Sequence, residues 1–168
     1  MLFEKSADAL MLLDETGFID CNEATVQLFG FTSKKEFVGL HPSELSPPIQ
    51  PDGMSSIESA KLHMETAFST GNNKFEWQHI RKNGEAFIAE VVLTAYSIGG
   101  KKMLQAVVRD ITDKYEAEKE VAYLQKLLLT SIDQSPAGIL IADAPEVSIR
   151  LANKAAIGMQ GKGKKTSQ

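Results

Sequence analysis

Two glycine-containing turns divide the middle of the chain into three segments in which apolar and polar residues alternate. Asn83-Gly84 lies between residues 75–81 and 87–96, and Gly99-Gly100 precedes residues 103–111. Asn-Gly and Gly-Gly favour the tight turns of β-hairpins because both adopt positive φ at low cost. The pattern therefore predicts a meander of three antiparallel strands, and any fold of this chain has to be built around that sheet.

The residues before this sheet predict a hairpin followed by helices. Short apolar runs at 9–13 and 18–21 flank a turn at 14–17, which is typical of two paired strands. Asn22 is expected to N-cap a short helix that ends at Gly30, because its side chain can satisfy free backbone amides.

Two further helix starts are predicted by capping-box spacing, at Ser33-Lys-Lys-Glu36 and at Ser55-Ser-Ile-Glu58. The second helix is expected to be the longest of this half and to end at Gly71. Its predicted buried stripe consists of Ile57, Ala60, Met64, Ala67 and Phe68. Between the two helices, four prolines within residues 41–53 predict a loop without regular structure.

The last third of the chain begins with a helical pattern from Asp113 onward. Its apolar residues follow 4-3-4 spacing, which favours a short coiled coil, and they are Ala117, Val121, Leu124 and Leu128.

The chain also repeats itself at long range. Residues 135–143 echo residues 6–14, and residues 153–157 echo residues 22–26 after the turn lengthens by two residues. The repeat predicts a complete unit, a helical connector and the opening of a second copy, with disorder over residues 158–168.

Composition narrows the function classes. Acidic residues outnumber basic ones, 22 to 18, and the only basic run lies at residues 162–165, so a broad nucleic-acid-binding face is not expected. The single Cys21 excludes a disulfide framework, and His41, His63 and His79 form no metal-binding motif. With no membrane-spanning apolar run and no signal-peptide pattern, we expect a cytoplasmic protein or a cytoplasmic portion of a larger one.

Four short motifs together resemble the landmarks of a PAS domain, the sensory module of bacterial signalling proteins. They are Asp20-Cys-Asn-Glu-Ala24, Leu28-Phe-Gly-Phe31, Arg81-Lys-Asn-Gly84 and Arg109-Asp-Ile-Thr112. The resemblance implies an α+β PAS fold, with a five-stranded antiparallel sheet, helices on one face and a C-terminal connector helix. The implied parts are a PAS sensor domain over 1–112, a connector helix over 113–131, and the truncated start of a second PAS repeat with a disordered tail over 132–168.

In this fold the inner face of the sheet and the long helix line a pocket. Alternation along residues 87–93 gives one uniformly apolar face, which we place inward. The residues expected to contact a ligand or cofactor are Phe75, Trp77, His79, Phe87, Met64 and Val108. Two interpretations stay open for Trp77 and His79. They fill the core, or they stack on and hydrogen-bond a small planar or carboxylate-bearing ligand.

The resemblance leaves the cofactor unknown. Flavin photochemistry needs a reactive cysteine, and Pro42 occupies its place, while Val108 replaces the glutamine that reads the flavin edge; non-covalent FAD binding stays open. Haem-binding relatives use a histidine on the long helix, where His63 lies. However, His63 is about 90° from the centre of the apolar stripe, so a flank or surface position is favoured over iron ligation. His41 is expected to be solvated, and no metal site is predicted.

The predicted function is a sensory signal-transduction module that relays a change to an output domain, a histidine kinase of a two-component system or a cyclic-dinucleotide enzyme. The expected signal relay is Arg109, Asp110 and Thr112, with Thr112 capping the connector helix and Asp113 in its first turn. The expected partners are an unknown small molecule and a second copy, paired through residues 113–131. The main alternative is a ligand-free dimerisation and relay module. An enzyme is not favoured, because no G-x-S-x-G, P-loop or G-x-G-x-x-G motif is present and no catalytic residue is predicted.

Overall fold

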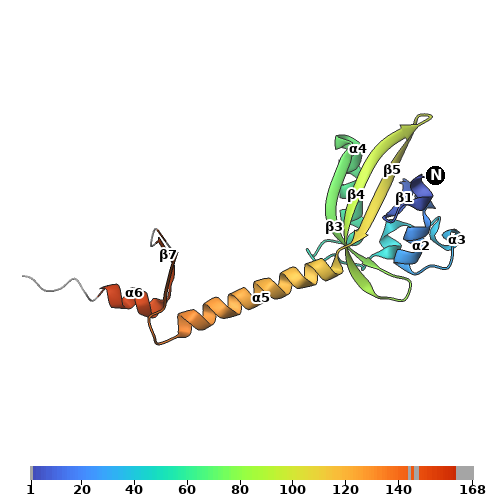
Figure 1. Cartoon of the computed structure of the whole chain (residues 1–168). Helices are drawn as coiled ribbons and strands as arrows, with labels where there is room; N and C mark the ends of the chain where they lie inside the picture. The colour runs from blue at the N-terminus through green and yellow to red at the C-terminus, as the bar shows by residue number, and fades with distance from the viewer. Residues whose placement is uncertain (1, 144, 146–147, 162–168) are drawn as a thin grey trace, which may run out of the picture. The chain divides into compact units, whose positions relative to one another are not determined.

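The computed structural model describes residues 2–143, 145 and 148–161, and the chain forms two units that divide between residues 115 and 116. The first unit contains a five-stranded antiparallel sheet in the order β2-β1-β5-β4-β3 (Figure 1). Its strands are β1 (Ala9–Asp14), β2 (Gly17–Cys21), β3 (Asn72–Ile80), β4 (Ala86–Ile98) and β5 (Lys101–Asp110). Its helices are α1 (Leu2–Lys5), α2 (Glu23–Phe29), α3 (Lys34–Phe37), the 3₁₀ turn η1 (Pro42–Leu45) and α4 (Ser56–Thr70). This is the predicted α+β architecture.

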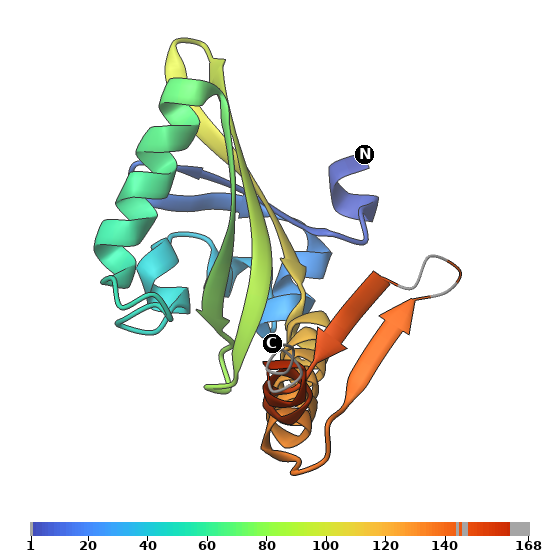
Figure 2. The same ribbon diagram turned by 90° about the vertical axis from the view of Figure 1, so that its left-hand side faces the viewer.

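The three-stranded meander predicted from the two turns is confirmed. In the β3–β4 pair Trp77 lies opposite Ala89 and His79 opposite Phe87, and Gly84 in the turn adopts a φ of 88°. Buried residues alternate along β4 and β5, so one face of the sheet is buried. Core residues from α2, α3, η1 and α4 belong to the same buried cluster, and Figure 2 shows α4 running along the sheet.

Asn22 N-caps α2 as predicted, and it also joins the first hairpin to the chain before it. Its Oδ1 accepts hydrogen bonds from the backbone N–H of Leu10 (3.0 Å) and of Thr25 (3.1 Å). Its Nδ2 donates to the carbonyl oxygens of Phe3 (3.2 Å) and Asp8 (2.9 Å). Because this amide is fully buried, every one of these bonds replaces a bond to water.

The two predicted capping boxes are wrong in their chemistry, although helices begin there. Neither the Ser33 nor the Ser55 side chain makes a cap hydrogen bond. The Glu36 carboxylate instead accepts the backbone N–H of Thr32 and pairs with Lys82 Nζ at 2.7 Å. Lys82, from another part of the chain, therefore pairs with Glu36, which the local pattern predicted to be part of the capping box.

The proline-rich segment is not without regular structure, because Pro42–Leu45 forms η1. Its capping box is built by His41 and Glu44. The ring Nδ1 of His41 accepts the N–H of Ser43, while the Glu44 carboxylate accepts the N–H of His41 at 2.7 Å. His41 is accordingly half-buried rather than solvated.

The buried face of α4 differs from the predicted stripe. Ile57 is 64% exposed, whereas Ser56 and Ser59 are buried next to Ala60. Ser56 is tolerated inside because its hydroxyl accepts a hydrogen bond from Gln50 Nε2 at 2.7 Å and donates to the carbonyl of Pro47. A stripe chosen for apolarity alone could not include these serines.

The second unit repeats the beginning of the first. After α5 (Thr112–Gln134) come β6 (Leu140–Asp143), β7 (Ser148–Ala152) and α6 (Lys154–Gly161). β6 and β7 pair with Leu140 opposite Ala152, as β1 and β2 pair with Met11 opposite Cys21, and the register shifts at the corresponding place in both hairpins.

Disorder predicted from residue 158 onward is wrong at its start, since residues 158–161 complete α6. Residues 162–168 lie outside the described residues. No helix among the described residues is both long and apolar enough to span a membrane.

Candidate functional site

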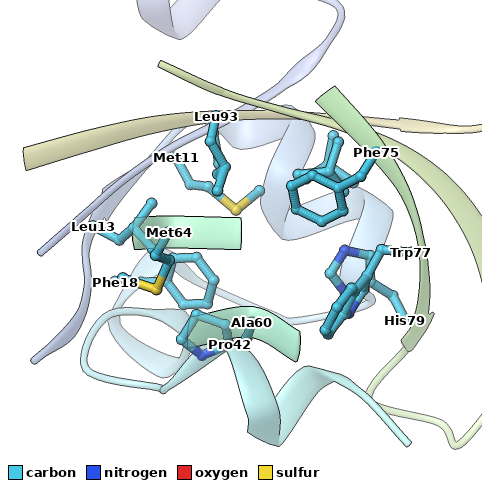
Figure 3. A pocket seen from close by; sticks show the side chains of 13 residues that line it. Met11, Leu13, Phe18, Pro42, Ala60, Met64, Phe75, Trp77, His79 and Leu93 are labelled. Atoms are coloured by element: carbon cyan, nitrogen blue, oxygen red, sulfur yellow. The ribbon is translucent and has the colours of Figure 1, made fainter. Parts of the chain in front are cut away.

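A cavity of about 50 Å³ lies between the buried face of the sheet and α4. Figure 3 shows its wall, which combines residues of β1, β2, η1, α4 and β3 to β5. The lining residues are Met11, Leu13, Phe18, Pro42, Ala60, Met64, Phe75, Trp77, His79, Val91, Leu93, Ala106 and Val108. Five of the six residues predicted to contact a ligand are therefore brought together here.

Phe87 is the exception. It is buried, but it lies beyond His79, whose ring stacks on it with centroids 5.4 Å apart. The Arg81 guanidinium also lies over the Phe87 ring, 4.2 Å from its centroid, and Phe87 packs edge-on against Phe29. The alternation of β4 correctly predicted that Phe87 faces inward. Which of the inward residues border the cavity depends on how the helices pack on the sheet, and the alternation does not contain that information.

The wall also includes residues that the sequence reasoning missed. Met11 and Leu13 of β1, Phe18 of β2 and Pro42 of η1 close one side of the cavity. Met11 and Leu13 lie in the apolar run 9–13, which predicts a strand but contains no polar residue to show which side chains face inward. Pro42 carried no signal either, because its position depends on the unpredicted η1.

His79 is the most unusual residue of the wall. Its Nδ1 lies 3.1 Å from the carbonyl oxygen of Leu45, and a carbonyl can only accept, so Nδ1 carries the proton. Its Nε2 is buried and has no hydrogen-bond partner within the described part of the chain. Burial lowers the pKa of His79 to about 4, although the Leu45 carbonyl works in the opposite direction. The imidazole is therefore neutral near pH 7, with Nε2 as a bare acceptor.

Trp77 has no polar group left for a ligand. Its Nε1–H donates to the hydroxyl of Ser46 at 2.9 Å, and the residue is 5% exposed. Its ring packs edge-on against Phe75 with centroids 5.9 Å apart. Trp77 can therefore offer a ligand only its apolar surface.

His63 lies on α4 between Ser59 and Ala67; it is half-buried and stays outside the core cavity, which fits the predicted flank position. Its ring stacks on Phe75 with centroids 3.6 Å apart, and its Nδ1 accepts a hydrogen bond from Asn73 Nδ2 at 2.9 Å. It lines a separate polar cavity of about 190 Å³ and not the core cavity. Burial lowers the pKa of His63.

Haem and FAD do not fit the core cavity as it stands. Cavities for ligands of drug size usually measure about 300–1,000 Å³, and this one measures about 50 Å³. His63, which lies on the helix that carries the haem ligand in haem-binding relatives, lines the other cavity. Among the described residues no three His, Cys, Asp or Glu side chains gather to hold a metal ion.

The predicted relay residues tie β5 to its neighbours at the start of α5. The Asp110 carboxylate accepts the backbone N–H (2.9 Å) and the hydroxyl (2.7 Å) of Thr112, so Asp110 rather than Thr112 acts as the cap. It also accepts from Arg81 Nη2 at 2.6 Å. Partial burial opposes ionisation of Asp110, but Thr112 and Arg81 outweigh it and lower its pKa. Thr112 Oγ1 in turn accepts the N–H of Ile88 on β4, at 3.0 Å.

Arg109 points elsewhere. Its guanidinium donates to both carboxylate oxygens of Asp8, at 2.9 and 3.1 Å, just before β1. The three predicted relay residues therefore do not form one cluster, because Asp110 and Thr112 hold the helix start while Arg109 holds the beginning of the sheet.

These features agree with comparisons with known proteins. A family model described as a PAS domain matches residues 7–113, more than half of the chain. The chain belongs to the PAS domain family. A second PAS domain model matches residues 122–161, which supports the predicted start of a second PAS domain.

The relatives of this PAS protein are distant. An uncharacterised protein of Azorhizobium caulinodans is 26% identical over 78% of this chain and 17% of its own length. The methyl sulfide methyltransferase-associated sensor of Methanosarcina acetivorans is 28% identical over 70% of this chain and 11% of its own length. The chain thus spans less than a fifth of either curated relative. The PAS domain structure of a Colwellia psychrerythraea protein matches with a TM-score of 0.58 and 21% identity, over 67% of this chain and 92% of that one.

Proposed function

We propose that the first PAS domain binds a small molecule in its core cavity and passes the resulting change through β5 into α5. One observation carries the proposal. Ala106 and Val108 stand on the cavity wall, and two residues further along the same strand Asp110 caps α5. A ligand that displaces this part of β5 would move the cap, because Asp110 and Thr112 leave little slack between strand and helix.

The polar ties around Asp110 support this route. Ile111 N–H donates to the carbonyl of Ile88 at 2.9 Å, so both backbone groups of Ile88 on β4 bond to the start of α5, at Ile111 and Thr112. A change in the β4–β5 pairing would therefore alter the direction or register of α5. The domain itself is proposed to have no catalytic activity.

Filling the cavity tests the route without knowledge of the ligand. Ala106→Leu adds volume inside the cavity, while Gln105→Leu places the same new side chain on the opposite face of β5. We expect Ala106→Leu to change amide hydrogen exchange over residues 112–115, and Gln105→Leu to leave it unchanged. Equal exchange in Ala106→Leu and the wild type would contradict the relay.

Occupancy of the cavity is tested separately. A denatured extract of the purified chain, analysed by mass spectrometry, is expected to release a small molecule from the wild type and none from Ala106→Leu. An absorption spectrum with a Soret or flavin band would contradict the size argument against haem and FAD.

The second candidate function is a ligand-free dimerisation and relay module. It is favoured by the small cavity volume and by the aromatic rings of Phe75 and Trp77 on the wall. In that case the extraction yields nothing, yet the hydrogen-exchange response to Ala106→Leu persists.

Dimerisation is proposed through α5, which has no buried residue. Val121, Leu124 and Leu128 of the seam are 52–60% exposed, and pairing with a second copy would cover them. Light scattering over a concentration series is expected to show a dimer of the wild type and a monomer of Val121→Asp/Leu124→Asp. A wild type that stays monomeric at tens of micromolar would refute this pairing.

We propose that the output domain of the whole protein is a histidine kinase of a two-component system or a cyclic-dinucleotide enzyme, and that the module works in the cytoplasm. The name of the Methanosarcina relative as a sensor supports the signalling role. The low share of both relatives that this chain spans is consistent with large additional domains in such proteins.

A further inference from the structure

We infer that the core cavity selects small, mostly apolar molecules that carry one hydrogen-bond donor, such as a hydroxyl group, and that it disfavours carboxylates. The inference rests on the proposed function, because it names the class of ligand for the same cavity. It also differs from the planar or carboxylate-bearing ligand that the sequence suggests.

The wall of the cavity is almost entirely apolar. None of the thirteen lining residues carries a charge near neutral pH, and only Trp77 and His79 have a side-chain nitrogen or oxygen atom. Trp77 already donates its only N–H to Ser46. The single polar side-chain atom that lacks a partner on this wall is therefore Nε2 of His79.

The hydrogen bond that His79 Nε2 lacks has a fixed direction. Because Nδ1–H donates to the Leu45 carbonyl, Nε2 has a lone pair and no proton. A buried acceptor without a donor lowers stability, and a ligand hydroxyl or amide N–H would remove that deficit. The ligand has to supply the proton of this bond.

The same lone pair on Nε2 disfavours carboxylates. A carboxylate has only acceptor atoms, so it would face the Nε2 lone pair with lone pairs of its own. Protonated His79 could pair with it, but burial holds the pKa of His79 at about 4, so the cation is scarce near neutral pH. No other cation stands on the wall to compensate the loss of hydration.

The cavity also limits the size of its ligand. One water needs about 10–15 Å³ of comparable space, so the cavity of about 50 Å³ holds a molecule of roughly three to five non-hydrogen atoms. Nε2 is shielded from water in this conformation, between Phe87 on one ring face and the edge contact with Phe29. A ligand that reaches it must shift wall side chains, and Trp77, two residues away on β3, should report the change.

Two isomers and one anion test the inference. They are 1-butanol, methyl propyl ether and butanoate, titrated against the full chain while the fluorescence of Trp77, its only tryptophan, is recorded. We expect 1-butanol to bind about three- to tenfold more tightly than the ether, the range of one net hydrogen bond. Butanoate is expected to bind more weakly than either at pH 7.

Variants assign the preference to His79. His79→Leu should reduce the alcohol-to-ether ratio to about one, whereas His63→Leu, which changes a histidine outside this cavity, should leave the ratio unchanged. If His79→Leu does not fold, the ¹⁵N resonance of His79 Nε2 in the wild type is expected to shift with 1-butanol and not with the ether. An unchanged resonance would overturn the inference.

The outcomes separate the two proposals. Equal binding of alcohol and ether, or tightest binding of butanoate, overturns the donor rule and leaves ligand binding intact. If none of the three probes changes Trp77 fluorescence saturably, the cavity does not take ligands of this size, and both the sensor proposal and this inference fail.

Discussion

Acidification should destabilise this protein through His79 before most carboxylates titrate. In the folded state burial lowers the pKa of His79 to about 4, whereas the unfolded chain has the ordinary value of 6.5. Between these values the unfolded state binds more protons than the folded one, so stability falls as the pH falls. The contribution of His79 to stability is fully present above pH 6.5, declines between pH 6.5 and pH 4, and is lost below pH 4.

The size of the loss follows from the two pKa values. A tenfold change in an equilibrium constant corresponds to about 1.4 kcal/mol, so His79 alone should lower the free energy of unfolding by about 3 kcal/mol between pH 7 and pH 4. This is a large part of the roughly 5–15 kcal/mol that stabilises an ordinary domain.

Urea denaturation at several pH values isolates this effect when His79→Gln is measured beside the wild type. Glutamine does not titrate, and its amide N–H can still donate to the Leu45 carbonyl. The difference in unfolding free energy between the two proteins should therefore shrink by about 3 kcal/mol from pH 7 to pH 4. His63→Gln is the control and should keep the slope that His79 causes. A pH dependence that is the same in His79→Gln and the wild type would show that His79 titrates normally.

Three further substitutions test the packing around the site by urea denaturation. Trp77→Ala should lower the free energy of unfolding by about 3–5 kcal/mol because the ring is buried. Glu90→Ala, on the opposite face of the sheet, should change it little. Equal losses in the two variants would contradict the burial of Trp77. Asn22→Ala should cost at least about 2 kcal/mol, since it leaves several buried backbone groups unpaired, and a smaller loss would mean that water replaces the amide. Asp110→Ala should cost about 1–2 kcal/mol through loss of the cap and should raise hydrogen exchange at the N–H of Thr112, while unchanged exchange there would contradict the capping role.

The sequence was a good guide where one local pattern decides the structure. The strands on either side of Asn83-Gly84 could be predicted because the pleat of a strand turns successive side chains to opposite faces. The bounds of α2 could be predicted because Asn22 and Gly30 suit the backbone hydrogen bonding at its two ends. Both kinds of pattern depend on residues close together in the sequence, so they can be interpreted without knowledge of the tertiary contacts.

Local patterns failed where a distant partner decides. Ser56 is buried because Gln50 bonds to it, and Gln50 is held in turn by the N–H of Gln78 at 2.9 Å. Glu36 forms an ion pair with Lys82 instead of the predicted capping box with Ser33. The same holds for His79, whose tautomer depends on the carbonyl of Leu45, 34 residues away. The acceptor character of the cavity could not be predicted from any motif.

Asn153 makes in the second unit the hydrogen bonds that Asn22 makes in the first, and one of them reaches the connector helix α5. Asn153 Oδ1 accepts the N–H of Ile139 (2.8 Å) and of Ala156 (3.0 Å), while its Nδ2 donates to the carbonyls of Ala137 (2.9 Å) and Ile132 (2.8 Å). Asn22 bonds to the corresponding groups in the first unit, where the carbonyl of Phe3 in α1 takes the place of Ile132. Ile132 belongs to α5, so the last turn of the connector performs for β6 the task that α1 performs for β1. In the proposed relay, a movement of α5 therefore reaches the first strand of the second copy through a buried amide rather than through a flexible link.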